Sequence, residues 1–390
     1  MTERGAHIPA LDGLRGFAVA AVLLFHAGQL RGGFLGVDLF FVLSGFLITG
    51  LLLGEAAGHG RIALAAFWGR RARRLLPALV CVAVVTVPAT WVWGSPAQLR
   101  FALDDLPWVA AQTVNWHYIT EQIGYWNASD TRVFAHLWTI GVEWQFYLAW
   151  PLVVVACGRY GERMVALLAG SGALVCLVLT VRLGAAVDTT RAYEGTDTRA
   201  AGLLLGALAA TAPVRDLARR VPRRVADPAC LVLACALAVA WAVTEGEKAP
   251  LLFQGGLFLH SLAAAALIVV MAEVPGTRAA RIAGSHLPRR LGEVSYSLYL
   301  WHWPVYLLLL PRISRPGDRG GAAVAIVVSL VAAAATKRLV EDPVRFRSGW
   351  ARGRRGLVAV SALALTGVAL WAVIPAPVPG AGTVDIGQLR

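Results

Sequence analysis

Charged residues are scarce in this chain of 390 residues, of which only 15% are Asp, Glu, Lys or Arg. Apolar residues make up 57%, and the mean hydropathy is +0.63. This composition excludes a soluble globular protein and predicts an all-α, polytopic membrane helix bundle. Internal repeats, low-complexity tracts and dividing linkers are also lacking. Residues 1–355 are therefore expected to form one membrane domain.

Cysteine is rare as well, and its spacing excludes the common zinc and iron–sulfur motifs. We therefore predict no metal site and no permanently bound cofactor. A small-residue cleavage site is missing after the first apolar run, so that run is expected to be a retained helix and not a signal peptide. The five cysteines lie in or beside apolar runs, where we expect them to pack: Cys81, Cys157, Cys176, Cys230 and Cys235.

About 10–11 transmembrane helices are predicted from the apolar runs of the sequence. The last run is expected to be an additional helix beyond the main domain, followed by a flexible tail over 375–390. The runs are centred near 11–29, 34–53, 76–93, 137–157, 164–181, 200–212, 229–244, 251–272, 295–311, 321–336 and 356–374.

Basic residues indicate how these helices are oriented. With a cytoplasmic amino terminus, and with 101–118 not spanning, inner segments hold 24 of the 36 Lys and Arg residues. This satisfies the positive-inside rule and predicts a multi-pass protein of the plasma membrane with 94–136 as an outer loop. Topology thus explains the net charge of +13 better than nucleic-acid binding does.

The first helix carries ionisable groups at membrane depth, which are costly there unless they face protein or water. Arg15 and His26 are eleven residues apart, so they share one helical face and lie roughly 16 Å apart along the axis. They cannot touch each other, but one long ligand can touch both. Asp12 lies one turn before Arg15.

Three residues are candidates for catalysis near the outer side of the membrane. His26, Asp38 and Glu143 are expected to lie at a common level, and a histidine flanked by a carboxylate suits general-base catalysis. The alternative for either carboxylate is a buried ion pair or hydrogen-bond network that holds helices together.

A basic cluster, Arg70, Arg71, Arg73 and Arg74, lies at the inner mouth of the third helix. Guanidinium groups match phosphate oxygens, so the cluster suits an anionic phosphorylated ligand. The alternative is a cluster that enforces topology or binds anionic lipid.

Further polar residues are candidates for an acceptor site or for structural hydrogen bonds. Ser295, Tyr299 and His302 share one face of a helix, where an interhelical hydrogen bond is the main alternative to ligand contact. Asp197 and Arg199 can bind a polar acceptor or form a surface salt bridge. The full set is Asp12, Ser44, His136, Asp197, Arg199, Ser295, Tyr299 and His302.

Several motifs, in this order, resemble those of the acyltransferase 3 family of integral-membrane O-acyltransferases. They extend from Leu11 to about Pro343 and read LDGLRG, GVDLFFVLSGFLIT, RRARRLLP, HLWTIGVEWQFYLAWP, TDTRAAGLLLGAL, SYSLYLWHWP and VEDP. Many relatives carry an additional extracytoplasmic hydrolase-like domain, so the chain is interpreted as a stand-alone member.

The resemblance implies transfer of an acetyl or other short acyl group from acyl-CoA to a hydroxyl of a sugar, cell-surface glycan or macrolide. It also implies that Arg15, His26, Arg71 and Arg74 are essential. A coenzyme A arm is anionic at one end and reactive at the other, which fits loop arginines at the inner mouth and His26 deeper in. Without a nucleophile elbow, we expect direct transfer with His26 as the general base.

The alternative function is a membrane transporter or flippase that uses the intramembrane charged residues. The lack of an inverted repeat and of paired broken helices speaks against it.

Overall fold

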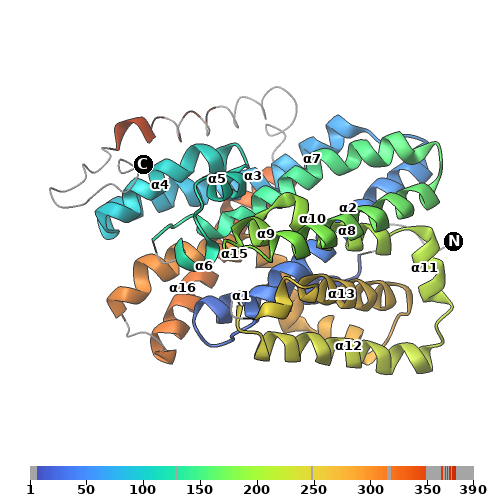
Figure 1. Ribbon diagram of the computed structural model, residues 1–390. Coiled ribbons are helices and arrows are strands. Elements are labelled where there is room, and N and C mark those ends of the chain that lie inside the picture. Colours follow the sequence, from blue (N-terminus) through green and yellow to red (C-terminus); the bar gives the residue numbers. More distant parts are fainter. Residues whose placement is uncertain are drawn as a thin grey trace.

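The computed structural model describes residues 7–128, 131–246, 249–313 and 318–347, and some positions between 362 and 374. All regular secondary structure in these residues is helical, which confirms the all-α membrane bundle (Figure 1). Most of the helix expected over 356–374, and the whole of the tail expected over 375–390, lie outside the described residues.

Ten of the expected spans are helices in the described part of the chain. Eight helical segments there are long and apolar enough to cross a membrane. Residues Thr190–Ala209 and Ala212–Arg219 form a further pair of segments, bent by 62° at a short break, and the number is nine if this pair is one span. The helices are α1 (Pro9–His26), α2 (Gly36–His59), α3 (Leu64–Trp93), α7 (Trp138–Gly158), α8 (Glu162–Leu183), α10 (Thr196–Ala209), α12 (Arg223–Val243), α13 (Gly256–Glu273), α15 (His286–Ile313) and α16 (Arg319–Thr336).

The region 101–118 does not form a continuous span. It is divided between α4 (Pro96–Ala110) and α5 (Val114–Thr120), and α4 is too short to cross a bilayer. This agrees with the prediction that 101–118 does not span the membrane. The other short elements are α6 (Tyr125–Ala128), α9 (Thr190–Glu194), α11 (Ala212–Arg219), α14 (Arg278–Ala283), the 3₁₀ turns η1 (Gly33–Leu35), η2 (Ala135–Leu137) and η4 (Pro250–Leu252), and the π-helical turns η5 (Lys337–Glu341) and η6 (Pro343–Arg347).

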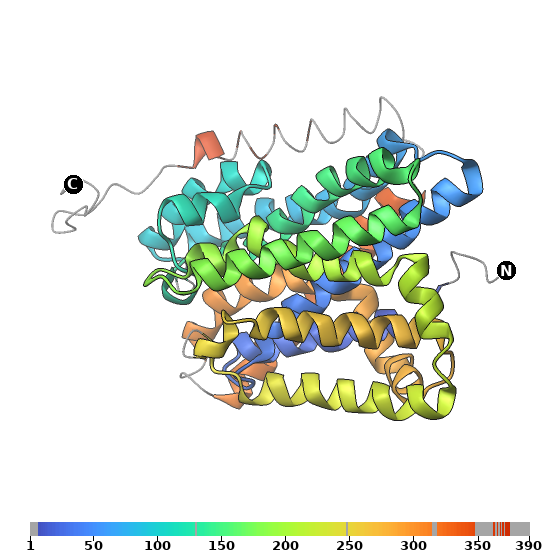
Figure 2. The same cartoon turned by 45° about the vertical axis from the view of Figure 1, so that its right-hand side comes forward.

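Helix α1 runs through the middle of the bundle, where it packs against α15 and α2. Both views show α12 at one edge of the bundle and the α4–α5 region at the opposite edge (Figures 1 and 2). The central position of α1 buries its polar residues among other helices. Most of them are thereby kept away from lipid, where an ionisable side chain costs free energy.

Glycines allow α1 and α15 to approach with their backbones nearly in contact. A β-carbon added to Gly292 of α15 would lie 1.8 Å from the carbonyl oxygen of Asp12, and one added to Gly16 of α1 would lie 2.0 Å from that of Pro288. Small residues permit such close helix packing in membranes. The approach sets the position of α1, and with it the positions of Arg15 and His26.

We predict that Gly292→Ala lowers stability by about 1–3 kcal/mol, since the two backbones must separate to admit the methyl group. Thermal unfolding in detergent measures the effect. Gly170→Ala in α8 is the control, because the nearest atom to its added β-carbon is a leucine methyl at 3.8 Å. Equal melting temperatures for the two variants would contradict the close approach.

The topology can be tested with single cysteines at exposed positions, after replacement of the native cysteines. We expect Ala97→Cys to react with an impermeant maleimide in intact cells and Ser285→Cys to react only after lysis. Labelling of Ser285→Cys from outside would show that 101–118 spans the membrane and that the following helices are inverted.

Candidate functional site

A large cavity of about 1270 Å³ opens among α1, α2, α3, α7 and α15. Its wall extends from Glu55 and His59, at the end of α2, to Thr139 and Tyr299, beside the histidines of the bundle. Eight of the residues predicted from the sequence line it: Asp12, Arg15, Ser44, Arg71, Arg74, Glu143, Ser295 and Tyr299.

Arginines dominate the charge of this cavity. Arg15, Arg71, Arg74 and Arg345 all line it, and Arg15 and Arg71 each interact electrostatically with Arg74. Within the described ranges, none of the four has a carboxylate oxygen within 4.0 Å. Guanidinium groups that come together without a directly paired carboxylate can bind an anion with several charged oxygens, such as a phosphate.

Carboxylates also line the cavity, namely those of Asp12, Glu55, Glu143 and Glu273. Ser44 Oγ donates a hydrogen bond of 2.6 Å to Glu143, and the Tyr147 hydroxyl donates to Ser44 Oγ at 3.3 Å. Glu143 interacts electrostatically with Arg15 and Arg74. This glutamate therefore helps to hold the arginines in place, and the cavity keeps a positive excess.

The other two arginines of the predicted loop do not line the cavity. Arg70 pairs with Glu55 at 2.9 Å on the exposed side of α3, and Arg73 also lies outside the lining residues. Of the four loop arginines predicted to bind one ligand, the structure thus brings Arg71 and Arg74 to the cavity and leaves Arg70 and Arg73 outside it. Arg71 and Arg74 are three residues apart on α3, a spacing at which both side chains can reach one ligand.

His26 ends α1 and is half-buried, just beyond the cavity wall. Its Nε2 lies 3.1 Å from the Tyr125 hydroxyl, and its Nδ1 lies 3.1 Å from Nε2 of His302. Tyr299 links these histidines to the cavity, since it lines the wall and its ring centre is 5.2 Å from that of His302.

The expected pairing of His26 with a carboxylate is not found among the described residues. Asp38 instead accepts a hydrogen bond of 3.0 Å from Arg199, and both side chains are buried. The guanidinium of Arg199 also lies 5.0 Å from the centre of the Tyr193 ring. Asp38 of α2 and Arg199 of α10 thus form a buried ion pair between helices, which was the alternative to a catalytic role for this carboxylate.

The remaining predicted polar residues lie in two different settings. Asp197 pairs with Arg191 at 2.7 Å near the surface, which matches the salt-bridge alternative. His136 is buried and contacts the Leu300 carbonyl through Nε2 at 3.1 Å. Tyr299 donates to the His136 carbonyl at 2.9 Å and lies 2.8 Å from Thr139 Oγ1, so η2 and the start of α7 hold it in place.

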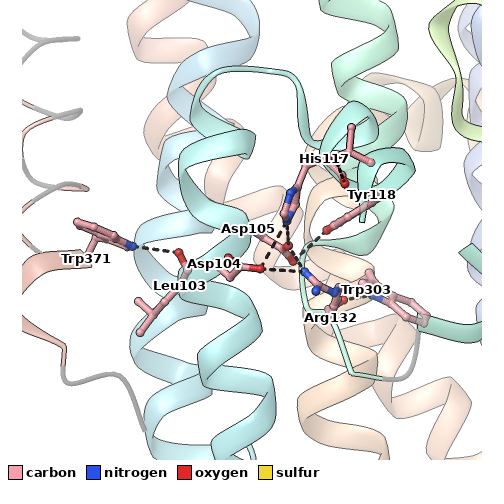
Figure 3. Close-up of polar contacts among 9 residues, drawn as sticks. Leu103, Asp104, Asp105, His117, Tyr118, Arg132, Trp303 and Trp371 are labelled. Carbon is pink, nitrogen blue, oxygen red and sulfur yellow. Dashed lines mark hydrogen bonds and ion pairs between the residues drawn. The ribbon is translucent and has the colours of Figure 1, made fainter. Parts of the chain in front are cut away.

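The Trp303 ring packs against the His26 ring, with 4.6 Å between the ring centres. Its indole donates a hydrogen bond of 3.0 Å to the carbonyl of Arg132 (Figure 3). The Arg132 side chain pairs with Asp105, which also accepts a hydrogen bond of 2.9 Å from Tyr118. The segment 94–136 thereby positions a residue that packs on His26.

Asp104, Asp105 and His117 have ligand atoms within 4.8 Å of one another, a spacing that a metal ion requires. Arg132 already contacts both carboxylates and supplies the positive charge that an ion would bring. Burial raises the pKa of Asp105 to about 6, so this carboxylate is mainly ionised and paired at neutral pH. We interpret the group as an ion-pair cluster.

Several residues of the site were not identified from the sequence: Tyr125, Arg132, Tyr147, Trp303 and Arg345. Only Trp303 and Tyr147 lie inside motifs of the resemblance. Arg345 was counted as one of many topological charges, and Tyr125 and Arg132 lie in a loop without a periodic pattern.

Comparison with known proteins places the chain in a family. The chain is 33% identical to the peptidoglycan O-acetyltransferase OatA of Listeria monocytogenes over 352 residues, which cover 87% of this chain and 56% of that protein. It is also 33% identical to the O-acetyltransferase OatA of Staphylococcus aureus, over 78% of this chain and 51% of the relative. The chain thus spans about half the length of these curated relatives.

No solved structure matches the chain. The family model described as an acyltransferase domain matches residues 8–338, which include Arg15, Arg71 and Arg74 of the cavity and the histidines beside it. The chain therefore belongs to the acyltransferase 3 family.

Proposed function

We propose that the protein is a membrane O-acetyltransferase that moves an acetyl or other short acyl group from acyl-CoA to a hydroxyl of a cell-wall glycan. The observation that carries this proposal is the convergence of Arg15, Arg71 and Arg74 in a cavity whose wall reaches the histidines around His26. Family membership supports acyl transfer, and the names of the two relatives support acetyl and glycan.

The donor fits the cavity by charge and shape. The phosphates of coenzyme A would lie among the arginines, where charge-assisted hydrogen bonds are strongest. The extended arm would then follow the cavity toward Thr139 and Tyr299, bringing the thioester to the side of His26. Arg15 and His26 lie on the one helix α1, as expected for contacts with two parts of a long ligand.

His26 is the proposed general base. The acceptor oxygen attacks the thioester carbonyl carbon while His26 takes the hydroxyl proton. The carbon–oxygen bond forms, the carbon–sulfur bond breaks, and the protonated imidazole returns the proton to the departing thiolate. Direct transfer requires no covalent intermediate on the protein.

The acceptor is the less constrained part of this proposal. A peptidoglycan hydroxyl follows from the relatives, and a glycosylated macrolide is the second candidate because it presents the same sugar hydroxyls. Purified protein offered acetyl-CoA with either peptidoglycan fragments or a macrolide panel distinguishes them by mass spectrometry of the product. We expect acetylated glycan.

The same assay separates an enzyme from a transporter or flippase. An acyltransferase releases free coenzyme A thiol in proportion to acetylated product, whereas a transporter would move a solute into or out of vesicles without thiol release. Solute uptake in the absence of thiol release would overturn the proposed function.

We predict that His26→Ala lowers kcat for acyl transfer by about 100-fold or more, the contribution expected of a general base. The measurement is thiol release with acetyl-CoA and acceptor. His260→Ala is the control, since His260 is a buried histidine of α13 outside the cavity lining. A His26→Ala protein that turns over within a few-fold of the parent protein would remove His26 as the base.

We predict that the double replacement of Arg71 and Arg74 by Ala raises KM for acyl-CoA about tenfold or more, because two charge-assisted contacts to phosphate are lost. KM for the acceptor should change little. Replacing Arg70 and Arg73 by Ala is the matched control, since it removes the same charge from the same helix outside the cavity. Equal effects of the two double variants would favour a purely topological role for the cluster.

A further inference from the structure

His26 and His302 contact each other through ring nitrogens, and this contact bears on which nitrogen of the proposed base carries the lone pair. We propose that His302 is a positioning residue that accepts a hydrogen bond from Nδ1–H of His26 and so leaves Nε2 of His26 as the basic atom. This inference rests on the proposed function, and it goes further by assigning a role to a second histidine.

The argument begins at the backbone carbonyl of Tyr299. His302 Nδ1 lies 2.5 Å from this oxygen, on the preceding turn of α15. A carbonyl oxygen only accepts hydrogen bonds, so the Nδ1 atom of His302 must carry a proton. A neutral imidazole has a single N–H group, and Nε2 of His302 therefore presents a lone pair.

His26 occupies the next position in this chain of hydrogen bonds. Its Nδ1 lies 3.1 Å from Nε2 of His302, and since that atom accepts, Nδ1 of His26 must donate. Nε2 of His26 then carries the lone pair. The Tyr125 hydroxyl, 3.1 Å away, can donate to it, as the hydroxyl of an acceptor substrate would.

Burial explains why an imidazole can take the place of a carboxylate here. The side chain of His302 is completely buried, and a neutral partner avoids the cost of placing another charge at that depth. A general base needs an oriented partner, which a neutral acceptor also provides.

The surroundings hold His302 in the required orientation. The carbonyl of Tyr299 belongs to the same helix, and the Tyr299 hydroxyl is anchored to η2 through the His136 carbonyl. Trp303, the next residue of α15, packs on His26 and is anchored to the Arg132 carbonyl (Figure 3). Helix α15 thus contacts the His26 ring through two adjacent side chains.

The competing explanation is an interhelical link that only stabilises α1 against α15. The two explanations differ in the chemistry that position 302 needs. A positioning role needs a hydrogen-bond acceptor directed at His26, whereas a packing role needs only a side chain of suitable volume.

The test compares His302→Gln with His302→Met, two side chains of similar length. The Gln amide oxygen can accept the hydrogen bond from His26, and Met offers no comparable acceptor. We expect His302→Met to lower kcat on the order of 100-fold at unchanged KM for acyl-CoA, because an unfixed tautomer disables the base. His302→Gln should keep kcat within about fivefold of the parent protein, since the Gln side chain retains a hydrogen-bond acceptor.

His260 provides a matched control. Its Nε2 accepts a hydrogen bond of 3.0 Å from the Trp241 indole, and it is buried like His302. The same Gln and Met replacements at His260 should leave kcat within about twofold of the parent protein, because they change the contact between α12 and α13 and not the surroundings of His26. Equal losses of kcat in the Gln and Met variants of His302, or an unchanged kcat in His302→Met, would overturn the positioning role.

A second measurement does not depend on turnover. In protein labelled with ¹⁵N-histidine, the His26 signals can be assigned by their loss in His26→Ala, and their shifts report which nitrogen is protonated. We expect Nδ1–H in the parent protein and a mixture of tautomers in His302→Met. Protonated Nε2 in the parent protein would refute the assignment. Failure of the proposed function would instead appear as absent acyl transfer in the parent protein.

Discussion

The contact between the backbones of α1 and α15 is the constraint on which the rest of the site depends. Gly16 and Gly292 have no β-carbons, so carbonyl oxygens of each helix fit against the other. Residues that are 276 positions apart in the sequence, His26 and His302, are thereby brought within hydrogen-bond distance. A separation of one ångström would break that bond, which is why the approach matters for chemistry as well as for stability.

The protein handles buried charge in two different ways. Asp38 and Arg199 neutralise each other as a buried ion pair, and aromatic rings cover the guanidinium. The cavity arginines are balanced only in part, by Asp12 and Glu143 acting at longer range. Uncompensated charge at depth is expensive. The excess of arginines in the cavity supports the proposal that an anionic ligand binds there.

The sequence predicts the spans well because length and hydropathy decide them. The shared helix of Arg15 and His26 also follows from spacing alone. Hydropathy gives the depth of a residue but not the direction in which its helix faces, and for this reason Asp38 was expected beside His26 although it turns toward α10. Tyr125 could not be predicted, because its position depends on the fold of an outer segment without periodic pattern.

The Tyr125 hydroxyl lies 3.1 Å from Nε2 of His26, the atom that takes the proton of the acceptor in the proposed mechanism. An acceptor therefore exchanges one hydrogen bond for another, and the exchange costs it about 0.5–1.5 kcal/mol of affinity. A water molecule must also displace the Tyr125 hydroxyl from His26, but it makes no additional binding contacts that would offset this cost. In the proposed mechanism, a side chain that shields the base in this way would protect a bound thioester from hydrolysis until the acceptor arrives, and the Tyr125 hydroxyl would act as an internal competitor of the substrate.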